Sequence, residues 1–130
     1  MKMTVLLLLI AFTFLSCSSD PLDGYHKEGE ATTKKIVREL EKIHTREQLI
    51  AAEPRLRDLF DDLADTIAAA TEYKNEHDLP PSPAKKNGYN DSLRKELSRI
   101  YYIEGGRDIV EASQDSALEK LEHISTTPLL

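Results

Sequence analysis

Residues 54–76 have the sequence PRLRDLFDDLADTIAAATEYKNE, in which apolar side chains recur at steps of three and four. That spacing places them on one face of an α-helix, so we expect a helix over this range. Pro54 suits a first helical position because its missing N–H is not needed there, and we expect a kink or a restart at Glu53-Pro54. The apolar stripe comprises Leu56, Leu59, Phe60, Leu63, Ala64, Ile67, Ala70 and Thr71.

The residues before this segment predict a second helix and a short helical turn. Apolar residues with helical spacing indicate a helix over residues 31–44. Thr45 and Gln48 then form a capping-box pattern, which predicts a helical turn over residues 46–52. The inward positions of the helix ahead of Thr45 are Ile36, Val37, Leu40 and Ile43.

The residues after the central helix predict a loop and two further helices. Three prolines in Leu79-Pro80-Pro81-Ser82-Pro83 end the central helix because proline cannot continue it. A third helix begins after an N-cap among residues 90–92, and we expect Gly105-Gly106 to break it before a last helix over residues 107–124. The inward positions are Leu93, Leu97, Ile100, Tyr101, Ile109, Val110, Ser113, Ala117, Leu121 and Ile124.

The whole pattern predicts an all-α fold. No stretch shows the apolar–polar alternation of a half-buried strand. Short connections between most of the helices favour a small antiparallel bundle of three to four helices. We place this helical domain at residues 31–124, followed by a frayed tail at residues 125–130.

The N-terminus carries the clearest functional signal of the chain. Lys2 precedes an apolar run from Val5 to Leu15, and the chain's single cysteine, Cys17, follows Ser16. A membrane-spanning helix needs roughly 20 apolar residues, so this run is too short to cross a bilayer. A core helix of a globular domain would carry a polar face, which the run lacks. A positive residue followed by a short apolar run is typical of a secretory signal peptide.

The stretch Phe14-Leu15-Ser16-Cys17 resembles the lipobox of bacterial lipoproteins, whose cysteine becomes the first residue of the mature chain and carries the lipid. The resemblance implies a cleaved signal peptide at residues 1–16 and a membrane anchor at Cys17. Phe14 departs from the aliphatic residue usual in that family, which leaves ordinary cleavage without a lipid as the alternative. Serine rather than aspartate at position 18 favours the outer membrane. Residues 17–30 lack apolar periodicity, and we expect them to form a flexible lipidated tether.

Composition and spacing argue against several classes of function. The formal net charge of −6 opposes nucleic-acid binding, whose affinity comes from neutralised phosphates. A single cysteine excludes an internal disulfide and a cysteine-based zinc site. We expect no cofactor and no metal, and we interpret Glu119 and His123, one helical turn apart, as a surface pair. The acidic residues of the central helix, which we interpret as a solvated face, are Asp58, Asp61, Asp62 and Asp65.

No catalytic residue is predicted. The chain has no Gly-x-Ser-x-Gly elbow. Its nearest approach to an anion-binding loop, Gly105-Gly106-Arg107-Asp108, is more typical of a junction between helices. Tyr101 and Tyr102 cannot both face the core because adjacent helical residues point about 100° apart. One of these rings, together with Arg107, is therefore a candidate contact for a protein partner, the alternative being a ring at the edge of the core.

These features together favour a lipid-anchored bacterial envelope protein that is not an enzyme and acts as a protein-interaction module. A self-associating structural spacer is the first alternative, although prolines at positions 54 and 80 interrupt any long heptad pattern. A secreted helical protein without a lipid is the second. A monomer in sedimentation experiments would remove the spacer alternative.

Lipidation predicts a specific mass for the mature protein. Intact-mass analysis of the membrane fraction should find a chain that begins at Cys17 with added acyl mass, and Cys17→Ala should abolish that species, because the cysteine sulfur carries the anchor. A product cut near Ser19 without acyl mass would instead indicate a secreted protein.

Overall fold

The structure is a computed structural model that describes residues 21–79 and 88–126. These residues form four α-helices and no strand: α2 (Pro21–Glu41), α3 (Arg46–Glu76), α4 (Gly88–Tyr101) and α5 (Gly106–Thr126). The predicted all-α bundle is confirmed. The predicted signal peptide, Cys17, the prolines of the loop and the last residues of the tail lie outside the described residues.

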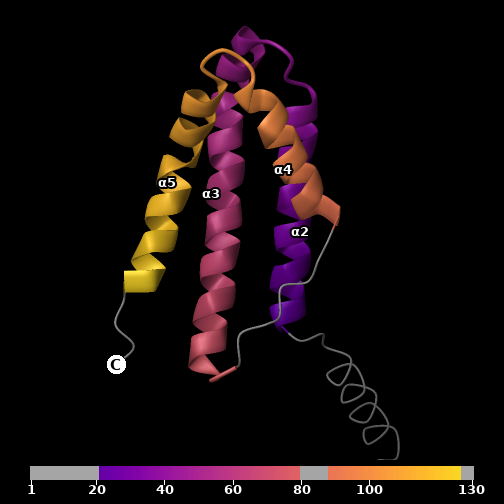
Figure 1. Ribbon diagram of the computed structural model, residues 1–130. Coiled ribbons are helices and arrows are strands. Elements are labelled where there is room, and N and C mark those ends of the chain that lie inside the picture. Colours follow the sequence, from indigo (N-terminus) through magenta and orange to yellow (C-terminus); the bar gives the residue numbers. More distant parts are fainter. Residues whose placement is uncertain (1–20, 80–87, 127–130) are drawn as a thin grey trace, which may run out of the picture.

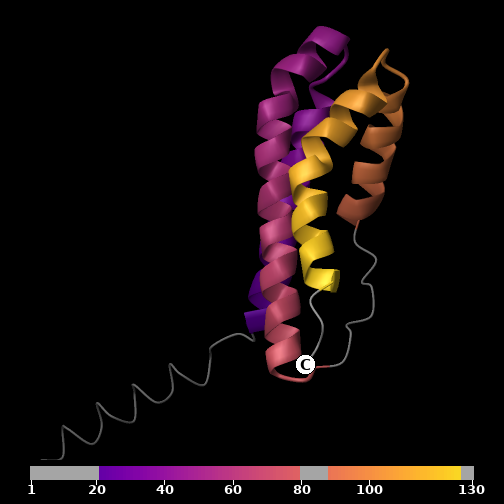
Figure 2. The ribbon, with the colours of Figure 1, turned by 90° about the vertical axis from the view of Figure 1, so that its left-hand side faces the viewer.

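The helices form two layers. The antiparallel pair α2 and α3 makes one layer, while α4 packs on α2 and α5 packs on α3 (Figures 1 and 2). The α2–α3 turn and the α4–α5 turn lie at the same end of the bundle, at the top of Figure 1. We call this end the tip, made by residues 42–46 and 101–107. The opposite end, where α2 begins and α3 ends, is called the base.

A single apolar core joins the four helices. Its members come from every helix, which explains how short helices with few aromatic residues are held together. Helix α3 starts at a complete capping box, in which the Thr45 hydroxyl accepts from the Gln48 N–H at 3.2 Å. The Gln48 side chain accepts from the Thr45 N–H in return. The buried core residues are Ile36, Leu40, Ile43, Leu49, Leu56, Phe60, Ala64, Ile100, Val110 and Ala117.

The first helix begins ten residues earlier than expected, so the predicted tether is wrong for residues 21–30. Pro21 stands at the first helical position, and Asp23 forms an i,i+4 ion pair with Lys27 at 3.1 Å. Gly29 faces α3, where a Cβ would meet the Thr66 methyl group at 3.9 Å, an ordinary van der Waals contact. The early turns of α2 thus pack on α3, and this packing makes them helical although their apolar periodicity is weak.

Pro54 lies inside α3 rather than at its start. The capping box already begins the helix at Arg46, so the expected restart does not occur. The turns ahead of Pro54 lean away from the axis of the remaining helix (Figure 2). Pro54 has no N–H and cannot donate a hydrogen bond to the Ile50 carbonyl, four residues earlier. Both residues are exposed, so this carbonyl lies on the solvent side of the helix.

Ile67 also departs from the predicted stripe, because its side chain is 42% exposed while Thr66 is buried. In the described part of the chain, α4 lies beside the half of α2 nearer the tip (Figure 1). Within the described residues, α3 packs on α2 and α5 and not on α4. Periodicity alone does not show how far those two helices cover the face that carries Ile67.

Arg99 of α4 closes the carboxyl end of α2. Its guanidinium donates to the Leu40 carbonyl at 2.7 Å and to the Ile43 carbonyl at 2.7 Å, and its Nε donates to Glu96 at 2.8 Å. The last carbonyls of a helix have no partner within the helix, and a cation there also suits the helix dipole. One side chain thus caps α2 and attaches α4 to it.

Replacing this guanidinium should destabilise the whole bundle. We expect Arg99→Met to lower the free energy of unfolding by about 2–4 kcal/mol, because two charge-assisted hydrogen bonds to partly buried carbonyls are lost. Urea denaturation followed by circular dichroism measures this loss. Arg94→Met, at an exposed position of the same helix, is the matched control and should stay within about 0.5 kcal/mol of wild type. Equal stability of the two variants would contradict the role given to Arg99.

Candidate functional site

The α4–α5 turn at the tip is a tight, hydrogen-bonded reversal. The Ile103 N–H donates to the Ile100 carbonyl at 2.9 Å, and the Gly106 N–H donates to the Ile103 carbonyl at 2.8 Å. Gly105 has a φ of +72°, a left-handed conformation that glycine adopts without strain. The predicted break at Gly105-Gly106 is confirmed, and it holds the residues on either side in fixed directions.

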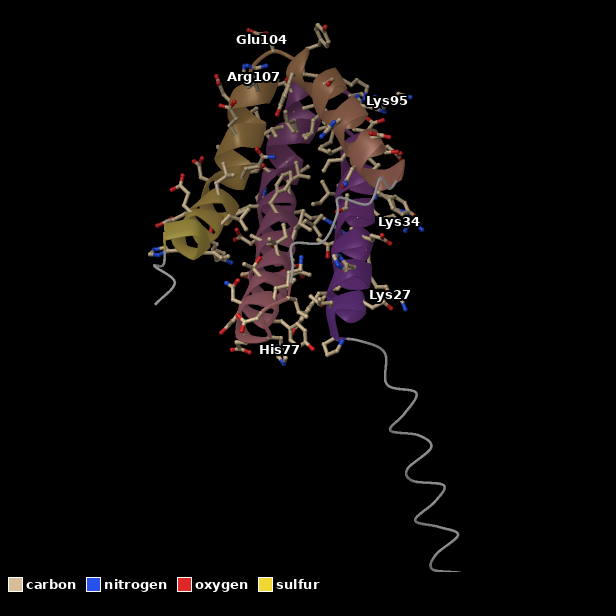
Figure 3. The ribbon with its side chains drawn as sticks, turned by 60° about the horizontal axis from the view of Figure 1, so that its bottom comes forward. Lys27, Lys34, His77, Lys95, Glu104 and Arg107 are labelled. Carbon is tan, nitrogen blue, oxygen red and sulfur yellow. The ribbon has the colours of Figure 1, made fainter. Side chains whose placement is uncertain are left out.

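The turn brings the three predicted contact residues together. Tyr101 is half-buried at the end of α4, whereas Tyr102 is 93% exposed, as the spacing argument required for one of the two rings. The Arg107 guanidinium carbon lies 5.0 Å from the centroid of the Tyr101 ring, a cation–π contact across the turn. Tyr101, Tyr102 and Arg107 line one shallow, open pocket with Ser98. Figure 3 shows Arg107 and Glu104 at this end of the bundle.

Arg46 is a tip residue that sequence reasoning missed. A Cβ built on Gly105 would lie 3.6 Å from Arg46 Nε, so this side chain lies against the α4–α5 turn. The capping box at Thr45 already placed Arg46 in the first turn of a helix. Its position beside Gly105, however, depends on how the two turns meet at the tip, which no local pattern reveals. Arg46 and Arg107 place two guanidinium groups at the tip, which also carries the exposed Glu104 and the exposed Tyr102 ring.

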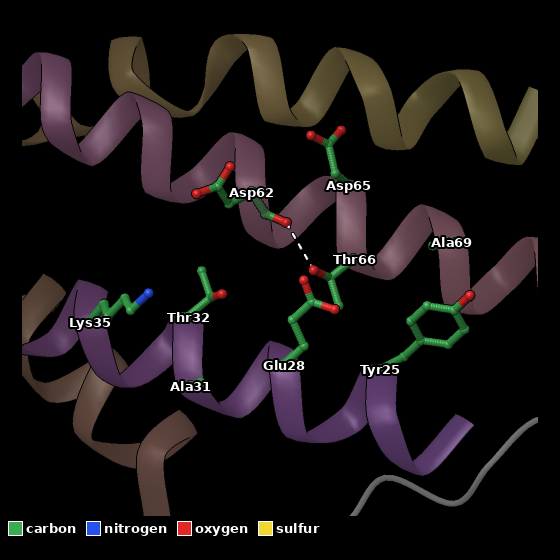
Figure 4. Close-up of a pocket in the computed structure, with 9 residues that line it drawn as sticks. All are labelled: Tyr25, Glu28, Ala31, Thr32, Lys35, Asp62, Asp65, Thr66 and Ala69. Atoms are coloured by element: carbon green, nitrogen blue, oxygen red, sulfur yellow. Dashed lines mark hydrogen bonds between the residues drawn. The ribbon is translucent and has the colours of Figure 1, made fainter. Parts of the chain in front are cut away.

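A second concavity runs along the outer side of α2 and α3. It encloses about 470 Å³, and Thr32 and Thr66 are its buried members. The Thr66 hydroxyl donates to the Asp62 carbonyl at 3.1 Å, as the dashed line in Figure 4 shows. Acid–base catalysis requires one carboxyl in an environment that raises its pKa, and the carboxylates of this open groove are exposed. The lining residues are Tyr25, Glu28, Ala31, Thr32, Lys35, Asp62, Asp65, Thr66 and Ala69.

The acidic residues of α3 serve partly to join α3 to α5. Lys120 pairs with Asp65 at 3.1 Å, and this hydrogen bond raises the pKa of the Lys120 ammonium. The hydrogen bond that Arg57 donates to the Glu53 carboxylate likewise raises the pKa of the Arg57 guanidinium. Asp61 adds to both effects, so its partly buried carboxylate lies in the field of two cations. The predicted solvated face therefore holds for Asp58, Asp62 and Asp65, which are exposed, although Asp65 also pairs with α5, while Asp61 is partly buried.

The described residues offer no metal site and no membrane-spanning helix. Across residues 21–79 and 88–126, no three histidine, cysteine or acidic side chains come together as metal ligands would. Glu119 and His123 are both exposed near the end of α5. Within the same ranges, none of the helices combines the length and the apolar character needed to cross a bilayer.

Comparison with protein-family models found no match, and comparisons with curated proteins and with solved structures found none either.

The close packing inside the tip predicts a large effect of one methyl group. A Cβ at Gly106 would overlap the Ile100 carbonyl oxygen and lie 3.1 Å from its carbon. We expect Gly106→Ala to lower the free energy of unfolding by about 2–4 kcal/mol, because the turn must open to admit it. Gly24→Ala is the control, since a Cβ there meets nothing within 4 Å, and it should stabilise α2 by about 0.5–1 kcal/mol. Thermal denaturation of the two variants checks both signs.

Proposed function

We propose that this chain is a lipid-anchored protein of the bacterial envelope, attached through Cys17 to the outer membrane, that acts without catalysis as a protein-interaction module. Its contact surface is the tip, with Tyr101, Tyr102 and Arg107 as the central residues. The observation that carries the proposal is the 93% exposure of Tyr102 beside the Arg107–Tyr101 contact. Tyrosine and arginine are enriched among the residues that dominate binding energy at protein interfaces.

The position of the N-terminus of α2 at the end of the bundle opposite the tip supports this assignment. Cys17 precedes Pro21, the first residue of α2, by only four positions, and Pro21 lies at the base. At 1.5 Å per residue, the 21 residues of α2 span about 30 Å. An anchor at Cys17 therefore holds the base near the membrane and presents the tip on the opposite side, where a second protein can reach it.

The rigidity of the tip also favours binding. The left-handed Gly105, the buried Gly106 and the Arg107–Tyr101 contact fix the turn before any partner arrives. Binding then loses less conformational entropy than it would if a mobile loop had to be ordered. An exposed ring on such a rigid turn is suited to fill a pocket of a partner.

Crosslinking tests whether the tip contacts a protein. We expect benzoylphenylalanine at position 102 to yield a defined adduct on irradiation of intact envelopes. The same replacement at Tyr89, which is 37% exposed at the start of α4, should not give that adduct. An adduct with a second copy of this chain would support the spacer alternative instead.

Substitution at the tip should then weaken that contact without unfolding the domain. We expect Tyr102→Ala and Arg107→Ala each to reduce capture of the crosslinked partner by about 10- to 30-fold, the effect of losing an interface hot spot. Because Tyr102 is 93% exposed, the helicity and melting temperature of Tyr102→Ala should match wild type. Unfolding of both variants would show that these residues are structural and would contradict the proposal.

A further inference from the structure

An aromatic cluster lies at the base, far from the tip. Tyr25 of α2 meets Tyr73 of α3 edge to face, with ring centroids 6.3 Å apart. Tyr73 in turn stacks on His77, with centroids 4.1 Å apart and an interplanar angle of 26°. The two tyrosines are half-buried and His77 is exposed, so part of the cluster is open to solvent at the end of the bundle. Figure 3 shows His77 at this end, opposite Arg107.

The charges around the cluster are mostly acidic. Leu79, which follows α3 directly, is 38% exposed. Asp23 is paired with Lys27 at 3.1 Å, whereas Glu28, which lines the groove beside Tyr25, is exposed. The last turn of α3 and the residues after it add Lys74, Glu76 and Asp78, which are one cation and two anions. A surface of this kind does not attract a strongly anionic partner.

We propose that the base, defined by Tyr25, Tyr73, His77 and Leu79, is a membrane-contact face that lies in the headgroup region of a phospholipid bilayer. The inference rests on the membrane anchor of the proposed function and adds an orientation to it. Tyrosine is enriched at the boundary between lipid and water, where its ring reaches the apolar side and its hydroxyl stays hydrated. The Tyr25–Tyr73 pair has this character on the face nearest the anchor.

The length of chain between the anchor and the base favours the membrane as the occupant. Four residue steps separate Cys17 from Pro21, and a fully extended chain covers at most about 3.5 Å per residue, or about 14 Å in total. The base is thus held within reach of the lipid headgroups at high effective concentration. Even a weak preference of two tyrosines and a leucine for the interface then suffices to keep the base on the membrane.

The acidic surroundings determine which lipid the base should favour. Contact by aromatic and apolar groups is insensitive to ionic strength, whereas interaction between charges is screened within about 8–10 Å at physiological salt. The base should therefore bind a zwitterionic phosphatidylcholine surface better than an anionic one, and its contact with phosphatidylcholine should not depend on salt. With the base lying on the membrane, α2 and α3 stand upright and project the tip away from the lipid.

A single tryptophan reports this orientation because the chain has none of its own. The chain from residue 17 to residue 130, which includes every described helix, is coupled through Cys17 to a maleimide phospholipid in phosphatidylcholine vesicles. We expect brominated phosphatidylcholine to quench the emission of Tyr73→Trp by about twofold, in 0.1 M and in 0.5 M salt alike. The matched control, Tyr102→Trp at the tip, should keep its full emission.

Absence of quenching for Tyr73→Trp would overturn the proposal, because the base would then not contact the lipid. Equal quenching of the two variants would also overturn it, because the base and the tip would then contact the lipid alike. Leu79→Trp is a second reporter at the base, at an exposed position that tolerates the larger ring, if Tyr73→Trp fails to fold. Chemical coupling supplies the anchor in this experiment. A failure to find native lipid on Cys17 would therefore contradict the proposed function while leaving the orientation measurement intact.

Discussion

The guanidinium of Arg99 is the interaction on which the arrangement of this bundle depends. It donates to two carbonyls at the end of α2, 56 and 59 positions away along the chain, while its own helix makes few close contacts with α5. Helix α4 is therefore positioned mainly by α2. Since the α4–α5 turn continues directly from α4, Arg99 also determines where the tip residues lie. A charge-assisted bond to partly buried carbonyls is strong enough to maintain this placement.

The bundle has two chemically distinct ends. The base gathers Tyr25, Tyr73 and His77 beside mostly acidic residues, and the tip presents Tyr102 with Arg46 and Arg107. In the proposed function, the anchor lies at one end and the exposed ring at the other, so the protein holds a partner at a set height above a membrane. The groove between α2 and α3, with its exposed carboxylates, lies along the side of the bundle and shares Tyr25 with the base.

Much of the fold could be predicted because its signals are local. The Thr45–Gln48 capping box and the Gly105-Gly106 break each depend on residues within about four positions of one another, and both are confirmed. The early start of α2 was missed because residues 17–30 carry too few apolar residues for a clear helical period, although Leu22, Tyr25 and Gly29 continue the helical spacing of Ile36. The stripe on α3 misplaced Ile67, because periodicity indicates a face but not where the neighbouring helix ends.

Local patterns along the chain predict the helical class, the capping and break positions, the apolar faces and the lipobox-like N-terminus, because each depends on neighbouring residues. Packing of the helices, in contrast, brings Arg99 to Leu40 and Ile43, Arg46 to Gly105, and Tyr25 to Tyr73. These pairs lie dozens of positions apart. Their contact depends on the lengths, crossing angles and turns of packed helices, which are properties of the assembled core rather than of any local segment.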